Sequence, residues 1–280
     1  MVKKDFDLAF AKISEAFPFK GYISEIVYQE MFSIVRALNK CIPVFKGHKL
    51  LDIGSGPMDK TAILQVLGFD CSAVDDLSDP WHLFNNNISK IKNFADSLGI
   101  NFHHQKDGMY EIPFEENTFD VVTSFSVIEH LHESPRGLLN TMGSYLNVGG
   151  FLVIVMPNSV NLRKRISVLF GKTNYNPIGE LYFSTESYRG HVREYTLSET
   201  VFLCEQSGFD VVYANTFEHF AHGKLKSPFR ELYLLLGCLI KGFRSGLLVI
   251  AQKPQEWLPV EKDEGKYYRS IMNAVPKGVV

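Results

Sequence analysis

Two glycines separated by one residue follow an apolar run that contains an acidic residue, in Leu50-Leu51-Asp52-Ile53-Gly54-Ser55-Gly56. Because glycine has no Cβ, the backbone can turn sharply after a strand and approach a ligand closely. The helix expected after this turn, over 59–67, points its partly positive N-terminus at whatever lies above the turn. This arrangement suits a nucleotide-type ligand, although a plain tight strand–helix turn has the same pattern.

A second acidic position follows the next apolar run. The stretch 69–74 leads into Asp75 and Asp76, and Asp75 comes 21 residues after Gly54. In a right-handed βαβ unit, this spacing puts Asp75 at the carboxyl end of the neighbouring strand. There its carboxylate can accept both hydroxyl hydrogens of a ribose. A helix N-cap or a solvated turn is the alternative for Asp75, and Asp76 is the weaker candidate.

The elements that must position these residues alternate between strand and helix. We expect helices over 59–67, 83–98 and 135–146, and strands over 49–54, 70–75, 101–105, 119–125, 150–156, 209–215 and 247–252. Strands 119–125 and 150–156 are apolar with little alternation, which is typical of strands covered by helices on both faces. The pattern predicts an α/β fold with a doubly wound, mostly parallel, seven-stranded Rossmann-like sheet.

The remaining segments define the expected domain organisation. Residues 1–45 form an N-terminal helical extension, 46–253 the main domain and 254–280 a tail, while 158–195 and 216–246 interrupt the βα rhythm. The net charge of −2 gives no electrostatic case for binding nucleic acid. The N-terminus does not resemble a signal peptide, no run is long enough to span a membrane, and the four cysteines are scattered. We therefore expect a cytoplasmic protein.

Six motifs occur in an order that is informative as a whole. They are Leu51-Asp52-Ile53-Gly54-Ser55-Gly56; Ala73-Val74-Asp75; Asp107 with 112–114 and 117–120; Ser126-Val127-Ile128-Glu129-His130-Leu131; Asn147-Val148-Gly149-Gly150; and Gly190-His191-Val192-Arg193-Glu194-Tyr195-Thr196. With these motifs the chain resembles a class I S-adenosylmethionine-dependent methyltransferase. It is most similar to the small-molecule enzymes typified by the ubiquinone and menaquinone methyltransferases. The resemblance covers about 46–215, and strand 247–252 fits the terminal antiparallel hairpin of the family.

The resemblance implies that S-adenosyl-L-methionine is the cofactor. The residues it assigns to the cofactor are Asp52, Gly54, Ser55, Gly56, Asp75, Asp76, Asp107, Gly108, Met109, Ser124, Phe125 and Ser126. Asp52 would lie near the amino group, Asp75 on the ribose, Asp107 on the adenine amine, and 124–126 would face the sulfonium. A turn residue is the alternative for Asp107. Met58 replaces the usual third glycine, and we expect it to narrow the space over the methionine part or to stack there.

Two histidines are candidate catalytic residues. A hydroxyl acceptor must lose its proton, and His130 and His191 are the natural bases. The alternatives are a buttressing role for His130 and a structural hydrogen bond for His191. Glu129, His130, His132 and His191 also have the composition of a metal site. However, fold relatives that bind magnesium use Glu-x-x-Glu-His, and Ser126 occupies the first of these positions, so no metal is predicted.

The segment 158–195 is expected to cover the acceptor. It carries several tyrosines and Arg163-Lys164-Arg165, which would be either a solvated helix face or a contact for an anionic substrate. We expect methyl transfer to oxygen or nitrogen of a small-molecule, glycan-type or lipid-linked acceptor, with at most peripheral membrane contact. The sequence indicates no oligomeric state. The competing hypotheses are a nicotinamide-dependent dehydrogenase or epimerase, and a non-catalytic module on the same fold.

Overall fold

The computed structural model describes residues 3–105, 112–185 and 187–267. Its centre is one seven-stranded sheet with the strand order β3-β2-β1-β4-β5-β7-β6. β7 runs antiparallel to both β5 and β6, and the other pairings are parallel. The strands are β1 Lys49–Ile53, β2 Asp70–Asp75, β3 Asn101–His104, β4 Phe119–Phe125, β5 Leu146–Pro157, β6 Asp210–Phe217 and β7 Gly246–Gln252. The predicted sheet and its C-terminal antiparallel strand are confirmed.

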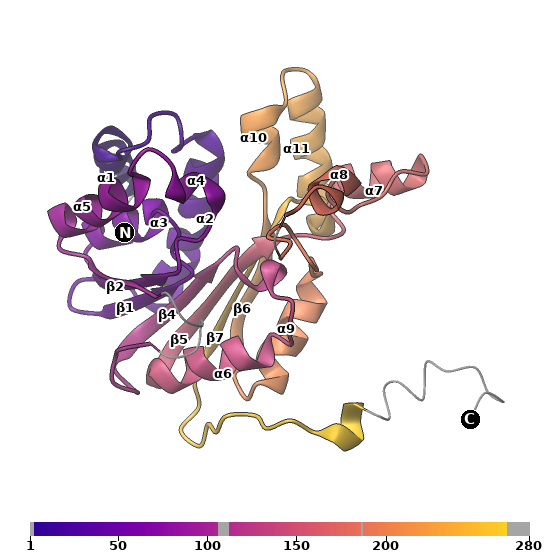
Figure 1. Cartoon of the computed structure of the whole chain (residues 1–280). Helices are drawn as coiled ribbons and strands as arrows, with labels where there is room; N and C mark the ends of the chain where they lie inside the picture. The colour runs from indigo at the N-terminus through magenta and orange to yellow at the C-terminus, as the bar shows by residue number, and fades with distance from the viewer. Residues whose placement is uncertain (1–2, 106–111, 186, 268–280) are drawn as a thin grey trace.

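Helices cover both faces of this sheet (Figure 1). One face packs against α1 Lys3–Ala16, α2 Glu25–Cys41, α3 Asp59–Val66 and α5 Asn87–Leu98, and the other against α6 Arg136–Tyr145 and α9 Leu197–Gln206. The remaining helices are α4 Pro80–Leu83, α7 Leu162–Leu169, α8 Ile178–Tyr182, α10 Phe220–Lys224 and α11 Phe229–Leu239, with short 3₁₀ turns η1 Ile128–His130 and η2 Lys241–Phe243. The result is a three-layer αβα arrangement.

The N-terminal helices share the core of the sheet. Phe6, Ile13 and Met31 are fully buried in the same apolar cluster as Leu50 of β1 and Val153 of β5. Because apolar side chains on one face of each helix lose contact with water here, this packing is a main stabilising term. The expected extension 1–45 therefore does not form a core of its own.

Two local expectations were wrong. The single helix predicted over 83–98 is divided into α4 and α5, because Asn85 and Asn86 adopt left-handed φ angles of 51° and 58° that interrupt the helix. The strand predicted over 150–156 is longer in the structure, because β5 begins at Leu146, directly after α6. Gly149 has φ +78°, so β5 begins with an irregular stretch rather than a loop.

The segment after β7 is attached to the main body as far as Val260, whose amide donates a 3.0 Å hydrogen bond to Oδ1 of Asn140 on α6. The Trp257 Nε1 donates a hydrogen bond of 2.9 Å to the carbonyl of Ser207. The Lys253 ammonium donates at 2.7 Å to Asn117 Oδ1 and to the carbonyls of Gly143 and Leu146. Among the described residues, no helix is long and apolar enough to cross a bilayer.

Candidate functional site

The glycine turn lies at the point where the sheet order reverses between β1 and β4. In open α/β sheets this switch point is where ligands bind. Gly54 has φ +77° and donates to the carbonyl of Val74 at 2.8 Å, and a Cβ at this position would collide with Val127. Gly56 has φ +53°, and a Cβ there would meet no atom within 4 Å. Gly54 therefore permits close packing of the chain, whereas Gly56 leaves open space above the turn.

Met58 does not occupy the space above the turn. It adopts a left-handed conformation with φ 65°, which explains why a glycine is common at this position. Its side chain is fully buried in the apolar core between α3 and the sheet. The expectation that Met58 narrows the cofactor space is therefore wrong.

Asp75 lies at the end of β2, directly beside the glycine turn. Its Oδ2 accepts a hydrogen bond from the amide of Gly56 at 2.8 Å, and its Oδ1 accepts from the amide of Leu77 at 2.7 Å. Burial raises the pKa of Asp75, and these two amide bonds partly offset that rise. A carboxylate has about four acceptor positions, so two remain for a pair of ribose hydroxyls.

Replacing Asp75 with alanine is expected to weaken S-adenosylhomocysteine binding about 10–150-fold, because a charged acceptor contributes about 1.5–3 kcal/mol. Calorimetric titration of the folded variant measures this loss. Asp75→Asn retains one accepting oxygen and the side-chain shape, so its affinity is expected to lie between those of the wild type and Asp75→Ala. Unchanged binding by a folded Asp75→Ala variant would exclude Asp75 from the ribose site.

Asp52 connects three elements of the core below the turn. Its Oδ2 accepts a 2.5 Å hydrogen bond from the Thr61 hydroxyl on α3, and its Oδ1 accepts a 2.8 Å bond from Thr123 on β4. Asp52 lines the cavity described below, but its carboxylate is only 1% exposed. Contact with the amino group of the cofactor stays a prediction, and the visible role of Asp52 is to hold β1, α3 and β4 together.

The buried carboxyl group of Asp52 is expected to make the stability of the protein depend on pH. Burial raises its pKa from 3.8 to about 6, so between these values the folded state binds more protons than the unfolded state. The contribution of Asp52 to the free energy of unfolding is therefore expected to be highest below about pH 4, to fall as the pH rises to about 6, and to level off above that.

The Asp52→Asn variant is expected to show a smaller fall between pH 4 and 6. It does not remove the fall completely, because burial likewise raises the pKa of Asp59 to about 6. Urea unfolding across this range compares the variant with the wild type. The exposed Asp96→Asn serves as a control that should retain the wild-type slope. A wild-type slope in Asp52→Asn would contradict the assignment.

The end of β4 supplies two of its three predicted residues to the cavity. Phe125 and Ser126 line it, and Ser126 has a left-handed φ of 60° that turns the chain away from the strand. Ser124 is fully buried and lines neither cavity described here. The geometry does not support the expectation that Ser124 faces the sulfonium. The predicted adenine contacts Asp107, Gly108 and Met109 lie outside the described residues.

A cavity of about 940 Å³ opens above the carboxyl ends of β1, β2 and β4. Residues 52–56, Asp75, Asp76, Phe125 and Ser126 line it, so most predicted cofactor residues share one cavity. Several lining residues were not predicted from the sequence, and these are Tyr22, Glu30, Lys60, Trp81 and His82. The Lys60 ammonium lies 2.8 Å from Glu30. A carboxylate on the buried face of an amphipathic helix is the sequence signal that could have identified Glu30.

Asp76 pairs with the cover segment. The Arg189 guanidinium lies 3.3 Å from Asp76 and 3.5 Å from Asp79, across the rim of the cavity. Both carboxylates and the guanidinium are about half exposed, so each ion pair contributes at most about 1 kcal/mol. These contacts connect the loop after β2 with the segment that precedes α9.

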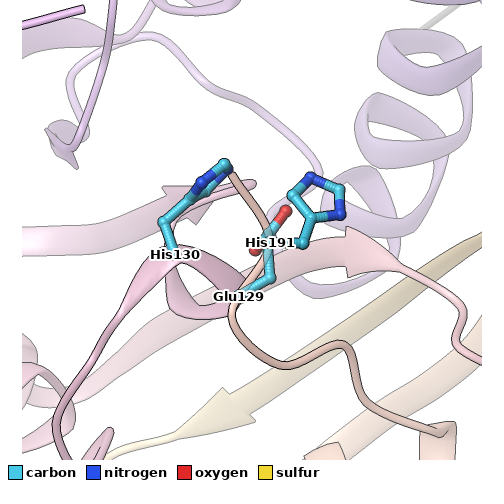
Figure 2. Close-up of side chains that lie close together, drawn as sticks. All are labelled: Glu129, His130 and His191. Atoms are coloured by element: carbon cyan, nitrogen blue, oxygen red, sulfur yellow. The ribbon is translucent and has the colours of Figure 1, made fainter. Parts of the chain in front are cut away.

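Three polar side chains converge beyond the end of β4: Glu129, His130 and His191 (Figure 2). The His130 and His191 rings are 4.9 Å apart and nearly perpendicular. Burial raises the pKa of Glu129 to about 7 and lowers that of His130. Burial also lowers the pKa of His191, but the hydrogen bond with Glu194 and the charges of Glu129 and Glu194 outweigh it, so the net shift is upward.

A second cavity, of about 440 Å³, lies under the segment 158–195. His191 lines this cavity and His130 lines the larger one, so the two rings adjoin both spaces. Lys164 and Glu194 form a buried ion pair in its wall. Within the basic run 163–165, Lys164 therefore points inward while Arg163 and Arg165 are exposed, so the run is not a uniform solvated face.

Comparison with known proteins agrees with this geometry. Residues 25–214 match the family model described as a methyltransferase domain, and no curated protein matches the chain. Three solved structures with 14–15% sequence identity show the same fold. One chain of a Haloferax volcanii complex containing the Trm112 methyltransferase activator has a TM-score of 0.56, with 81% of this chain and 91% of that chain covered.

The other two are described as S-adenosylmethionine-dependent methyltransferases. The Aquifex aeolicus protein has a TM-score of 0.51 and 15% identity, with 86% and 97% of the two chains covered. The Mesorhizobium loti protein has a TM-score of 0.51 and 15% identity, with 78% and 96% covered. The family match extends from α2 to β6 and does not single out the ubiquinone and menaquinone group. The chain therefore belongs to the methyltransferase domain family and is an S-adenosylmethionine-dependent methyltransferase.

Proposed function

We propose that this enzyme methylates an oxygen or nitrogen of a small-molecule, glycan-type or lipid-linked acceptor that binds under the segment 158–195. The observation that carries the proposal is the pair of cavities with His130 and His191 between them. The larger cavity contains the residues expected to bind the cofactor, and the smaller one lies against the cover segment. A methyl group would therefore pass from one cavity to the other beside the two imidazoles.

The larger cavity fits the cofactor in shape and donor set. Gly56 leaves its Cβ direction open, and Asp75 has acceptor capacity for the ribose. The Lys60 ammonium and the Glu30 carboxylate offer complementary charges for an amino-acid zwitterion. When bound, S-adenosylmethionine supplies an electrophilic methyl group on a sulfonium. The protein residues have to orient the acceptor and exclude water, which can supply several kcal/mol of barrier reduction.

His130 and His191 are proposed to handle the proton of the acceptor. In each ring Nδ1 already has a hydrogen-bond partner: the carbonyl of Arg189 for His130 and the Glu194 carboxylate for His191. This leaves Nε2 of each ring to accept a proton. General base catalysis of this kind contributes about 10²–10⁴-fold.

An exposed apolar surface near the cover segment supports a lipid-linked acceptor. Its side chains, on or just after α7, α8 and α11, are 46–79% exposed: Ile166, Val168, Leu169, Phe170, Ile178, Leu181, Tyr182, Phe183, Phe229, Leu232, Leu235 and Leu239. Figure 1 shows these helices toward one end of the molecule. On monomeric proteins, large exposed apolar patches often mark contacts with proteins or membranes. With exposed Arg163 and Arg165 alongside, the surface suits peripheral contact with an anionic membrane.

A two-part experiment tests this proposal. Calorimetry should show one site for S-adenosylhomocysteine, and a screen with methyl-labelled S-adenosylmethionine should transfer label to an acceptor of one of these classes. Co-sedimentation with anionic vesicles distinguishes a lipid-linked acceptor from a soluble one. Label found only on carbon, or only on nucleic acid, would contradict the proposal.

We also infer a cytoplasmic location, which the four free cysteines support.

A further inference from the structure

The Glu129 carboxylate is fully buried beside two histidines. Neither of its oxygens has a hydrogen-bond partner among the residues that the structure describes. A buried carboxylate without a partner destabilises the folded protein by several kcal/mol if it is charged. If the group is protonated, its hydroxyl has no hydrogen-bond acceptor. The position therefore requires a compensating group.

Each of the two histidines has one ring nitrogen in a hydrogen bond. The Nδ1 of His130 lies 2.7 Å from the carbonyl of Arg189, and the Nδ1 of His191 lies 2.8 Å from Oε1 of Glu194. A carbonyl or carboxylate oxygen accepts here, so each Nδ1 carries a proton, and in the neutral ring Nε2 has a lone pair for a metal ion. Histidines that bind metals are held in this way by an acceptor on the other ring nitrogen.

The distances between the candidate ligand atoms can be compared with those in a zinc site. One ligand atom from each of Glu129, His130 and His191 lies within 4.8 Å of the others (Figure 2). Zinc binds such ligands at about 2.0–2.2 Å in tetrahedral geometry, so its ligand atoms lie about 3.3–3.6 Å apart. Ligand atoms at the 4.8 Å limit would have to approach each other by up to about 1.5 Å, which rotation about side-chain torsion angles can supply.

We propose that Glu129, His130 and His191 bind a divalent transition-metal ion, with Zn²⁺ as the first candidate. Two imidazoles and one carboxylate favour such an ion over Mg²⁺, which prefers oxygen ligands and water. Three protein ligands leave coordination positions open, as in catalytic zinc sites. The sequence predicted no metal because Ser126 is not a carboxylate, but His191, 61 residues after His130, supplies the third ligand from the cover segment.

The metal site would take part in the proposed methyl transfer, and its catalytic role rests on that proposed function. His191 lines the smaller cavity and His130 the larger one, so an acceptor oxygen from the smaller cavity could occupy an open position. Its proton would then leave more readily, to water. The new bond forms between this oxygen and the methyl carbon, and the methyl–sulfur bond breaks with its electron pair kept on sulfur. In that case the histidines promote loss of the proton by holding the ion, so replacing His191 lowers turnover whether its ring takes the proton directly or binds the metal.

Metal binding by the full-length chain tests this inference directly. After dialysis against a chelator, calorimetric titration is expected to show one Zn²⁺ per chain, with Mg²⁺ much weaker. Glu129→Gln keeps the shape of the side chain and removes its charge, and His191→Ala removes one nitrogen. Each is expected to lower Zn²⁺ affinity by at least 10–100-fold, the range that even outer groups contribute. His222→Ala on α10, outside the lining of both cavities, is the matched control.

The two proposals fail in distinguishable ways. No stoichiometric Zn²⁺ binding, a preference for Mg²⁺, or full affinity in Glu129→Gln would overturn the metal site. Circular dichroism and S-adenosylhomocysteine titration of each variant show that the fold and the cofactor cavity are intact. If the wild type binds S-adenosylhomocysteine and transfers label after chelation, the enzyme assignment stands and the catalytic role of the metal is rejected, while the titrations decide whether the metal site exists.

Discussion

A valine in place of Gly56 is expected to abolish S-adenosylhomocysteine binding, a loss of at least about 100-fold. The Cβ direction of Gly56 points into open space, so the protein itself has room for the side chain. A bound cofactor would have to share that space, and overpacking of about 1–3 kcal/mol, added to misplacement of the ligand, accounts for the loss. Calorimetry and thermal unfolding of the same variant separate lost binding from lost stability.

The matched control is Gly99→Val at the end of α5. Gly99 has φ +70°, and a Cβ there also meets no atom within 4 Å, but Gly99 is not part of the lining of the larger cavity. Both variants therefore carry the backbone strain of a side chain in the left-handed region, on the order of 1–2 kcal/mol. Binding is expected to be lost only in Gly56→Val. Cofactor binding by this variant with wild-type affinity would place the site elsewhere.

The sheet could be predicted from the sequence because its strands are bounded by local signals. Apolar runs of strand length and glycine turns are properties of neighbouring residues, so they can be recognised in the sequence. The position of Asp75 could be predicted for a similar reason. The handedness of a βαβ unit fixes where the end of the second strand lies relative to the first.

The direction of individual side chains could not be predicted from local patterns. Met58 and Lys164 were read as exposed toward a ligand or solvent, yet both point into the protein. Their orientation depends on partners that are distant in sequence: the core for Met58 and Glu194 for Lys164. The same holds for Glu30, which reaches the cavity from α2 through the packing of the N-terminal helices.

The proposed metal ligands include positions that follow from local sequence and one that depends on long-range contacts. Glu129 and His130 are adjacent in the sequence, and their position beyond β4 follows from the fold. His191 comes from a segment whose path is set by long-range contacts. The amides of Val192 and Arg193 donate to the carbonyl of Glu129 at 2.8 and 3.2 Å. These two backbone bonds fix the distance between the histidines, and no local sequence pattern encodes them.

Replacing His191 with alanine is expected to reduce turnover about 100-fold or more, since proton handling contributes about 10²–10⁴-fold. His191 lines the acceptor-side cavity and not the larger one, so S-adenosylhomocysteine affinity should stay within a factor of a few. Transfer of labelled methyl to the identified acceptor measures the first quantity, and calorimetry the second. His222→Ala is expected to match the wild type in both.

The two measurements together identify the role of His191. Equal turnover in His191→Ala would return this residue to a structural hydrogen bond with Glu194. Loss of cofactor affinity as well as turnover would mean that the segment 158–195 orders the cofactor cavity, as the ion pairs of Arg189 with Asp76 and Asp79 make physically feasible. Loss of turnover alone is expected, because the imidazole adjoins the position where the acceptor must lose its proton.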